Sequence, residues 1–182
     1  MLRFEPLDRR HDRKGFRCGE AALDGYLHTT ARQHAEKGIS RTFVAVDVAR
    51  PTRVVGYFTL TVAEIDRVLL PAAQKRRLPE SVLPVIKLAR LAVDRDYQGQ
   101  GTGGVLLFEA LQRAATAQAL TGSVAVVVEA KHPKAAAFYA HFGFVPAPDD
   151  ELSLFMGFEP IRALIQANQA LMGGESSACY FR

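Results

Sequence analysis

Cysteine and long apolar runs are both scarce in this chain. Its 182 residues include only two cysteines, Cys18 and Cys179, and their spacing fits neither a metal site nor a redox pair. Two free thiols of this kind are typical of a cytosolic protein. No apolar run approaches the roughly 18–20 residues of a membrane span, and residues 1–5 lack the apolar region of a signal peptide. The sequence therefore predicts a cytoplasmic protein that has no membrane partner.

Internal repeats and metal-ligand patterns are also missing. The five histidines show no ligand spacing, so no metal is expected. With 48% hydrophobic residues, the chain can bury one substantial core, which favours one domain. The net charge of +4 and the isoelectric point near 9.3 permit a polyanionic partner but do not establish one.

The most informative segment, residues 91–104, has no lysine after its glycines. An apolar run ends at Val93, a polar tetrapeptide follows, and four glycines within six residues then lead into a helical pattern. A strand, a glycine-rich loop and a helix in this order direct backbone N–H groups and the positive helix end at an anion. Glycine lets a phosphate approach the backbone because it has no Cβ atom. The segment predicts a pyrophosphate-binding loop.

Three kinds of phosphate loop compete for this segment. A Walker A loop is excluded because it requires a lysine directly after its last glycine. The dinucleotide-binding pattern G-x-G-x-x-G is present at Gly99, Gly101 and Gly104, and Glu129 could serve as its ribose-binding acid. That pattern should directly follow its strand and be completed by a second nucleotide-binding half, and neither condition holds here. The third kind is the acyl-coenzyme A loop of the GCN5-related N-acetyltransferases (GNAT), Gln/Arg-x-x-Gly-x-Gly/Ala, which the sequence from Gln98 to Gly103 matches.

A second segment, residues 124–144, agrees with the third kind. It contains an apolar strand, a break at His132-Pro133, and a short helix followed by Phe142-Gly143-Phe144. This order resembles the closing half of a GNAT domain, in which an "fYxxxGF" signature lies one strand and one helix beyond the phosphate loop. The resemblance implies that Tyr139 lies near the thioester sulfur and protonates the departing thiolate. The alternative is that Tyr139 is a core aromatic, as we expect for the neighbouring phenylalanines.

Hydrophobic periodicity and turn residues predict an α/β (α+β) domain with a mixed sheet. Strands are expected at residues 2–7, 42–47, 54–65, 84–93, 123–129 and 152–158. Helices are expected at residues 20–36, with Gly38 as the C-cap, and at 102–120, 134–141 and 160–172. Residues 71–84 form an interrupted polar stretch, and residues 173–182 are expected to be a flexible tail.

The first forty residues narrow the family. The sequence Phe16-Arg17-Cys18-Gly19-Glu20-x-x-Leu23-x-x-Tyr26-Leu27 resembles the opening of the acetyltransferase toxins of type II toxin–antitoxin systems. Further matches extend the resemblance over residues 3–158. It implies a GNAT fold with a V-shaped splay in the sheet, an acetyl-CoA cofactor, and acetylation of the α-amine of aminoacyl-tRNA, which blocks translation. It also implies a ribbon-helix-helix antitoxin, operator DNA bound only jointly with that antitoxin, and a homodimer.

The resemblance assigns most of the site to the central strand and the loop. A backbone N–H of the strand is expected to polarise the thioester carbonyl at a bulge. The implied cofactor-binding residues are Leu91, Ala92, Val93, Gln98, Gly99, Gln100, Gly101, Thr102, Gly103 and Gly104. The GNAT domain is expected over residues 1–160, and residues 161–172 form an extra helix. One departure concerns the start of the helix that bears Tyr139, where many relatives have Asn and this chain has Lys131-His132-Pro133.

Binding of a tRNA requires basic residues near the acyl site. The candidates are Lys75, Arg76 and Arg77 in the polar stretch and Arg90 on the central strand. A cation in an otherwise apolar strand needs a partner, so Arg90 is expected to contact either tRNA or an internal carboxylate. The second group of cations, near the N-terminus, is expected to be a solvated face.

Two other functions are consistent with the same residues. One is acetyl transfer to a small amine or a protein amine. The other is a non-catalytic regulator that binds an antitoxin and operator DNA, although such a protein has no need to keep the loop and Tyr139. The sequence does not indicate which amino acid or tRNA is chosen.

Overall fold

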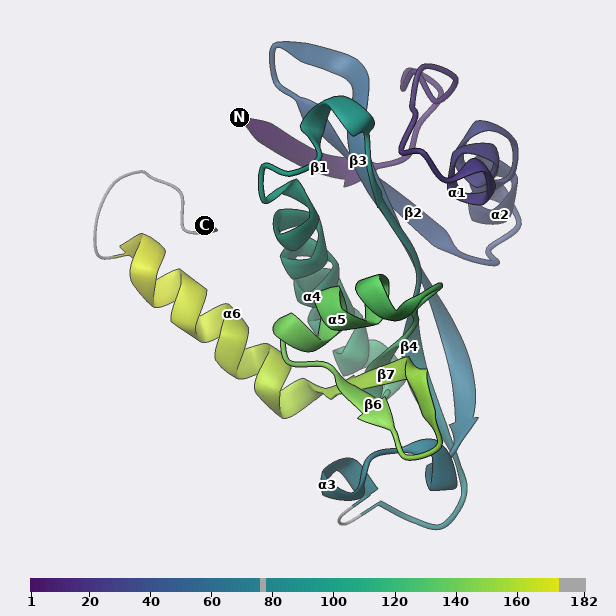
Figure 1. The fold of residues 1–182 in the computed structure, drawn as a ribbon, viewed down its shortest axis with the longest axis vertical. Coiled ribbons are helices and arrows are strands. Elements are labelled where there is room, and N and C mark those ends of the chain that lie inside the picture. Colours follow the sequence, from purple (N-terminus) through teal and green to yellow (C-terminus); the bar gives the residue numbers. More distant parts are fainter. Residues whose placement is uncertain (76–77, 174–182) are drawn as a thin grey trace. The chain divides into compact units, whose positions relative to one another are not determined.

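The computed structural model describes residues 1–75 and 78–173, which form a mixed α/β fold (Figure 1). Its strands are β1 (Leu2–Pro6), β2 (Arg41–Asp47), β3 (Arg50–Asp66), β4 (Val82–Val93), β5 (Ala125–Glu129), β6 (Val145–Ala147) and β7 (Asp150–Gly157). Its helices are α1 (Ala21–Gly25), α2 (Ala31–Glu36), α3 (Ala72–Lys75), α4 (Thr102–Thr121), α5 (Pro133–His141) and α6 (Phe158–Gly173). Three short helical segments complete the fold: the π turn η1 (Tyr26–Thr30) and the 3-10 turns η2 (Arg67–Leu69) and η3 (Arg95–Tyr97). Within the described residues, none of the helices has the length and apolar character needed to cross a membrane.

The strands form one seven-stranded sheet in the order β1-β2-β3-β4-β5-β7-β6. The β1–β2, β2–β3, β5–β7 and β6–β7 pairs are antiparallel, whereas β4 and β5 are parallel, with Ile86 opposite Val126 and Lys87 opposite Val127. The helix α4 supplies the crossover that a parallel pair requires. The mixed sheet predicted from the sequence is therefore confirmed, while the V-shaped splay stays a prediction.

The described residues divide into two compact units. The first comprises residues 1–61 and 89–110, and the second comprises residues 62–88 and 111–173. In the first unit, a core of aromatic and β-branched side chains lies between the α1–α2 segment and β2, β3 and β4. Phe16 and Tyr57 are fully buried in it, with their rings in an edge-to-face arrangement at 5.4 Å. This core fixes the segment that precedes α1.

The second unit has its own core, which includes Leu83, Val85, Val127 and Phe155. Strand β5 is apolar at four successive positions because both faces of this central strand are covered. Helices α5 and α6 both contact β7, and Ile161 anchors α6 with no exposed surface. The extra helix predicted near the C-terminus is thus present and packs on the sheet.

The first helical region differs from the continuous helix predicted over residues 20–36. It is divided into α1, the π turn η1 and α2, and the N–H of Ala31 donates to the carbonyl of Tyr26. Gly38 follows with a φ of +71°, which confirms the predicted glycine C-cap. A π turn inserts one residue into the helix and rotates the following side chains to another face. The average period of the sequence does not register a shift of this kind.

Three smaller differences concern β6, α3 and the start of β3. Strand β6 was not predicted because three residues are too few for a periodic pattern. The polar stretch contains the short helix α3, and β3 begins earlier than expected, at Arg50. The predicted flexible tail lies outside the described residues apart from Gly173, and so do Arg76, Arg77 and Cys179.

Candidate functional site

The glycine-rich loop joins η3 to the 20-residue helix α4 in the first unit. Gly99 and Gly101 have φ values of +72° and +78°, a region that side-chain-bearing residues rarely adopt. Among hydrogen bonds between described residues, none has the backbone N–H of Gln100, Gly101, Thr102 or Gly103 as its donor. These four donors lie at the positive end of a long helix, so the loop fits a pyrophosphate.

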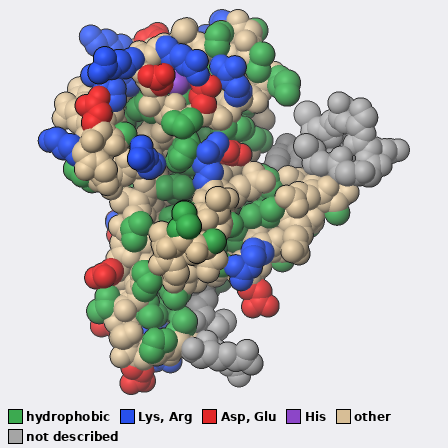
Figure 2. Space-filling view, turned by 180° about the vertical axis from the view of Figure 1, so that it is seen from behind, with side chains coloured by type: hydrophobic (Ala, Val, Ile, Leu, Met, Phe, Trp, Pro, Cys, Tyr) green, Lys and Arg blue, Asp and Glu red, His purple; other side chains and the backbone are tan. Residues whose placement is uncertain are grey.

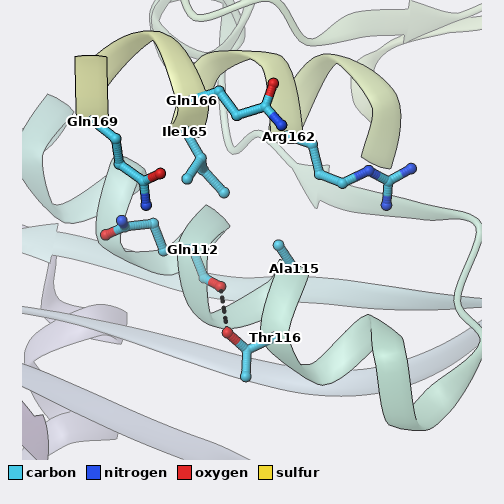
Figure 3. A pocket seen from close by; sticks show the side chains of 7 residues that line it. All are labelled: Gln112, Ala115, Thr116, Arg162, Ile165, Gln166 and Gln169. Carbon is cyan, nitrogen blue, oxygen red and sulfur yellow. Dashed lines mark hydrogen bonds between the residues drawn. The ribbon is translucent and has the colours of Figure 1, made fainter. Parts of the chain in front are cut away.

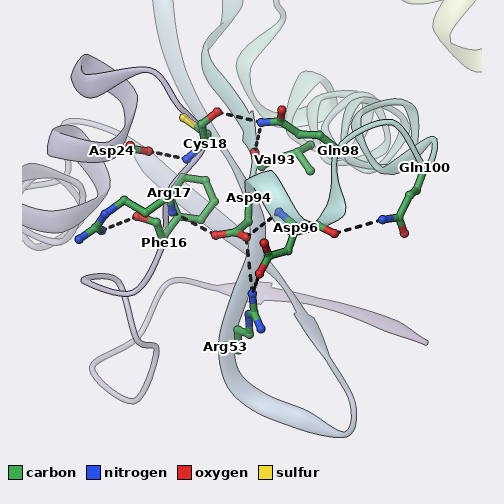
Figure 4. Close-up of polar contacts among 10 residues, drawn as sticks. All are labelled: Phe16, Arg17, Cys18, Asp24, Arg53, Val93, Asp94, Asp96, Gln98 and Gln100. Carbon is green, nitrogen blue, oxygen red and sulfur yellow. Dashed lines mark hydrogen bonds and ion pairs between the residues drawn. The ribbon is translucent and has the colours of Figure 1, made fainter.

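Gln98 and Gln100 hold the loop through their side chains, as Figure 4 shows. The amide of Gln98 donates to the carbonyl of Cys18 at 2.8 Å and to the carbonyl of Val93 at 2.9 Å. The amide of Gln100 donates to the carbonyl of Asp96 at 3.1 Å. The first position of the loop pattern therefore joins the loop to the end of β4 and to the segment before α1.

Asp94 connects three segments beneath the loop (Figure 4). Its carboxylate accepts the backbone N–H of Arg17 at 3.0 Å and that of Asp96 at 3.2 Å, and it pairs with Arg53 of β3 at 3.6 Å. Only 5% of Asp94 is exposed, and its own N–H donates to the carbonyl of Val55 at 2.8 Å. A buried carboxylate that accepts several N–H groups fixes the geometry of the backbone that donates them.

We expect Asp94→Asn to lower the free energy of unfolding by about 1–3 kcal/mol, because the new amide N–H₂ faces donors rather than acceptors. Through the loop, it should weaken affinity for acetyl-CoA, the expected ligand, on the order of tenfold in calorimetry. Asp96→Asn is the matched control, since the Asp96 side chain pairs with the same Arg53 but is 70% exposed. Equal acetyl-CoA affinity in the two variants would show that Asp94 does not position the loop.

The segment from Phe16 to Gly19 has a structural role. Phe16 lies in the core, the backbone of Arg17 and Cys18 is bound by Asp94 and Gln98, and a Cβ atom on Gly19 would lie 3.1 Å from the Arg95 side chain. Burial raises the pKa of the Cys18 thiol to about 11, and the hydrogen bond to Asp24 adds to the shift. A thiol that stays protonated is a poor nucleophile. The contacts of this motif hold the backbone that leads into α1.

The residues Leu91, Ala92 and Val93 complete β4 in the same unit. Ala92 is buried, and its carbonyl lies against Gly56 of β3, where a Cβ atom would come within 3.0 Å of the Ala92 oxygen and 2.5 Å of Leu106. Only glycine permits this close approach of β3 to β4 and α4. The role of a strand N–H in polarising the carbonyl stays a prediction.

Tyr139 lies in the second unit, near the end of α5. Its carbonyl accepts the N–H of Phe142 at 3.0 Å and that of Phe144 at 3.2 Å, and Gly143 supplies the φ of +93° that closes the helix. The Tyr139 ring meets the ring of Phe144 edge to face at 5.6 Å. The "fYxxxGF" spacing thus fixes the tyrosine by a helix end and a ring contact.

The hydroxyl of Tyr139 forms no hydrogen bond with any described residue, although its ring is packed. Burial raises the pKa of Tyr139 to about 12. The phenol therefore remains protonated at physiological pH and is free to donate. These properties suit a proton donor.

Helix α5 begins without the asparagine that the family resemblance implies at this position. The ring Nδ1 of His132 accepts the N–H of Ala135 at 3.1 Å, and Pro133 takes the first helical position. An N-cap acceptor followed by proline is a favoured helix start. The departure at this position is therefore compatible with a normally capped helix.

The proposed tRNA-binding cations have different surroundings. The guanidinium of Arg90 stacks on the ring of Tyr26, with its Cζ 3.7 Å from the ring centroid. Of the two contacts expected for Arg90, tRNA or an internal carboxylate, the carboxylate is not found among the described residues. Lys75 lies beside an open hollow of about 470 Å³ that also contains Asp66, Arg67 and Glu80. Because this hollow carries both signs of charge, it is not by itself a polyanion site.

Exposed charge on the molecule is mixed. Figure 2 shows a face on which Lys and Arg side chains gather with Asp and Glu side chains among them. Near the N-terminus, Arg3, Arg10 and His11 all pair with Glu5 at 2.7–3.0 Å. Part of this basic group is therefore neutralised internally, as expected for a solvated face.

A groove of about 420 Å³ separates α4 from α6 in the second unit (Figure 3). Gln112 and Ala115 point towards Ile165 and Gln169 across it. Among the described residues, the lining has no carboxylate, imidazole or thiol, and the hydroxyl of Thr116 donates to the carbonyl of Gln112 at 3.1 Å, so the groove presents no activated nucleophile. Within the described ranges, no cluster of His, Cys, Asp or Glu could hold a metal.

Sequence reasoning placed the loop, β4 and Tyr139 correctly on their elements but missed Asp94, Tyr26 and His132. Asp94 had a local signal, because an aspartate directly after a strand often accepts the N–H two residues on. His132 also had one, as the residue before a proline that starts a helix. Tyr26 had none, because its partner is 64 positions away in the sequence.

A family model for the acetyltransferase (GNAT) domain matches residues 38–146. Among curated proteins, the chain is 41% identical over 154 residues to a tRNA-acetylating toxin of Mycobacterium tuberculosis, covering 85% of this chain and 90% of that protein. It is 31% identical over 171 residues to a probable toxin TacT of Sinorhizobium fredii, covering 89% and 94% of the two chains.

The chain is also similar to solved structures of acetyltransferase toxins. AtaT complexed with acetyl-methionyl-tRNAfMet matches with a TM-score of 0.83 and 32% identity, covering 91% of this chain and 99% of AtaT. AtaTR bound with acetyl-CoA matches with a TM-score of 0.78 and 33% identity, covering 90% and 98%. An AtaT–AtaR complex bound to DNA matches with a TM-score of 0.72 and 31% identity, covering 90% and 99%.

Proposed function

The chain belongs to the GNAT acetyltransferase family, and from this premise we propose that it is a toxin of a toxin–antitoxin module. It uses acetyl-CoA to acetylate the α-amine of aminoacyl-tRNA, and the blocked amino acid stops translation. The observation that carries the proposal is the glycine loop at the start of α4, where four backbone N–H groups donate to no described residue. The chain that carries this loop is 41% identical to a tRNA-acetylating toxin. The toxin relatives support the choice of substrate.

Acetyl-CoA supplies an activated acyl thioester when it is bound. The N–H groups of Gln100 to Gly103 would hold its pyrophosphate, and Gln98 keeps the loop in place. A backbone N–H of Leu91, Ala92 or Val93 would polarise the thioester carbonyl. The hydroxyl of Tyr139, which stays protonated at physiological pH, would be the proton donor for the leaving thiolate.

The proposed nucleophile needs no strong base from the protein. An α-amine with a pKa near 7.7–8.0 is roughly 10–20% neutral at pH 7, whereas a lysine near 10.4 is only about 0.04% neutral. The ester bond of aminoacyl-tRNA withdraws electrons and lowers the pKa of the amine further. Water or a backbone carbonyl then suffices to take the proton, which is consistent with a site built around an acid, Tyr139.

The proposed partners and location are those that the resemblance to the toxin family implies. We propose a ribbon-helix-helix antitoxin, operator DNA bound only jointly with it, a homodimer and a cytoplasmic location. An AtaT–AtaR complex bound to DNA among the similar structures supports the antitoxin and DNA. Residues 1–160 are proposed as the catalytic domain and residues 161–172 as an added helix. Lys75, Arg76, Arg77 and Arg90 are proposed to contact tRNA.

Purified protein is expected to transfer labelled acetyl groups from acetyl-CoA to aminoacyl-tRNA but not to deacylated tRNA. Expression of the wild type alone should arrest growth by blocking translation, and co-expression of the antitoxin should relieve the arrest. The measurement is acid-precipitable label on a panel of charged tRNAs, compared with free amino acids and a lysine peptide. Label on small or protein amines, with charged tRNA unlabelled, would support a general acetyltransferase and contradict the proposal that the protein is a toxin.

A further inference from the structure

Arg90 is held against an aromatic face instead of a carboxylate. Its Cζ lies 3.7 Å from the centroid of the Tyr26 ring, a stacked cation–π geometry. In the described part of the chain, no acceptor or carboxylate is paired with its guanidinium, and none of its nitrogens is a buried unsatisfied atom. Arg90 is half-buried, so its N–H groups are open to solvent along the ring.

Two other arginines of this unit illustrate internal pairing. Arg53 pairs with Asp94 and Asp96, and Arg13 donates to the carbonyl of His28 at 2.9 Å. A guanidinium presents five donors in a fixed planar fork that matches a phosphate. Arg90 therefore has a fixed orientation and guanidinium N–H groups that donate to no described residue. Both properties suit a residue that binds an anion.

Tyr26 is itself fixed from several sides. Its hydroxyl lies 3.2 Å from the Oγ of Ser40, the ring of His34 meets it edge to face at 5.7 Å, and the ring of Tyr57 is stacked at 6.3 Å. Only 6% of Tyr26 is exposed. The ring cannot turn away, so the plane on which Arg90 rests is set before any ligand arrives.

The π turn η1 begins at Tyr26. Turns of this kind interrupt an α-helix at a cost in hydrogen-bond geometry and are frequent at functional sites. Here the turn presents Tyr26 to Arg90 of β4, and Tyr26, Leu27 and Ala31 all lie in the core. An unfavourable helix geometry is thus associated with one specific contact, the stack beneath Arg90.

We propose that Arg90 binds a phosphate group of a substrate and that Tyr26, placed by the π turn, is its positioning residue. This inference rests on the proposed function, because both substrates of that reaction carry phosphates: the phosphodiesters of the charged tRNA and the 3′-phosphate of acetyl-CoA. The stack holds the fork in advance, so less side-chain freedom is lost when the phosphate binds. An arginine that is already partly desolvated also gives up less hydration.

The test compares variants of the full chain in steady-state acetylation and in calorimetry. Arg90→Gln removes the fork, Arg90→Lys keeps the charge but loses the planar stack, and Arg50→Gln is a charge-matched control at the exposed first residue of β3. Tyr26→Phe keeps the aromatic face and loses the hydroxyl, whereas Tyr26→Leu loses the face. Thermal unfolding of each variant separates binding effects from folding effects.

Arg90→Gln and Arg90→Lys are expected to raise KM for one phosphate-bearing substrate about tenfold with kcat nearly unchanged, and Tyr26→Leu by a smaller factor. Tyr26→Phe and Arg50→Gln should resemble the wild type. If the phosphate is that of tRNA, KM for aminoacyl-tRNA rises and its salt slope falls by about one unit in Arg90→Gln. If it is that of acetyl-CoA, Arg90→Gln binds acetyl-CoA and its 3′-dephospho form equally.

Unchanged KM for both substrates in Arg90→Gln would overturn the inference even if the wild type acetylates charged tRNA. A wild type that leaves charged tRNA untouched would instead remove the proposed function, and the two failures are therefore distinguishable. Equal effects of Tyr26→Phe and Tyr26→Leu would show that the aromatic face of Tyr26 does not position Arg90.

Discussion

Tyr139→Phe is expected to lower kcat for acetyl transfer by about 10²–10⁴-fold while leaving affinity for acetyl-CoA almost intact, because only the departing thiolate loses its proton donor. The ring contacts with Phe138 and Phe144 are kept, so stability should change little. Growth arrest on expression should disappear with the activity. Rates with one charged tRNA and calorimetry with acetyl-CoA provide the measurements.

The control for this change is Tyr97→Phe, which removes a phenol hydroxyl from a ring that lies beneath Arg53. Full turnover in Tyr139→Phe would show that Tyr139 is a core aromatic and not the proton donor. A loss of turnover accompanied by an equal loss of acetyl-CoA affinity would indicate a packing defect and not a missing proton donor.

The pH dependence distinguishes the acid from other titrating groups. Burial raises the pKa of Tyr139 to about 12, so its hydroxyl is protonated throughout the physiological range, and kcat should show no alkaline decline from this group below about pH 11. The folded state holds this proton more tightly than the unfolded chain, whose phenol titrates near 10. The contribution of Tyr139 to stability is therefore complete below pH 10 and is lost as the pH rises towards 12. Absorbance titration of tyrosinate in wild type and Tyr139→Phe should show one late-titrating phenol fewer in the variant.

Gly101→Glu and Gly103→Glu are expected to abolish binding of acetyl-CoA, with a loss of affinity of at least 10²-fold. Each places a side chain and a negative charge among the N–H groups that hold the pyrophosphate. The two variants differ in stability: Gly101 has a φ of +78°, so its variant is strained, whereas Gly103 lies in the first turn of α4, where an acidic residue favours the helix dipole. Gly103→Glu should therefore fold well and still fail to gain thermal stability from acetyl-CoA.

Gly122→Glu is the matched control for the strained change. Gly122 follows the C-terminal end of α4 with a φ of +67°, and a Cβ atom added there would meet open space. It should show a comparable loss of stability with acetyl-CoA affinity preserved. An acetyl-CoA affinity equal to that of the wild type in Gly103→Glu would show that the loop does not bind the cofactor.

Much of the fold could be predicted because its elements have strong local signals. Strand β5 is apolar at four positions, α4 is long and bounded by glycines, and Gly38 ends the first helical region. The loop and Tyr139 were placed on their elements for a related reason, since each depends on a short motif whose spacing follows from backbone geometry. In "fYxxxGF", that geometry is a helix end closed by Gly143 and Phe144.

Contacts between distant residues could not be predicted in the same way. Asp94 and Arg17 are separated by 77 positions, and Gln98 and Cys18 by 80. Arg90 illustrates the difficulty: burial of a cation predicted a partner, but ring stacking and ion pairing satisfy the same requirement, and only the tertiary structure distinguishes them. The π turn was missed because an inserted residue changes the direction of side chains without changing which residues are apolar.

The raised pKa of Cys18 bears on covalent inhibitor design. At pH 7 an ordinary thiol is about 3% thiolate, whereas one with a pKa of about 11 is roughly 0.01% thiolate. The more basic thiolate is intrinsically more nucleophilic, which recovers roughly tenfold of the difference of about 300-fold. Electrophiles aimed at Cys18 should react on the order of 30-fold more slowly than with a free thiol. The presence of a cysteine in the opening motif is therefore a poor guide for covalent targeting, and the phosphate-binding loop offers the better handle for an inhibitor.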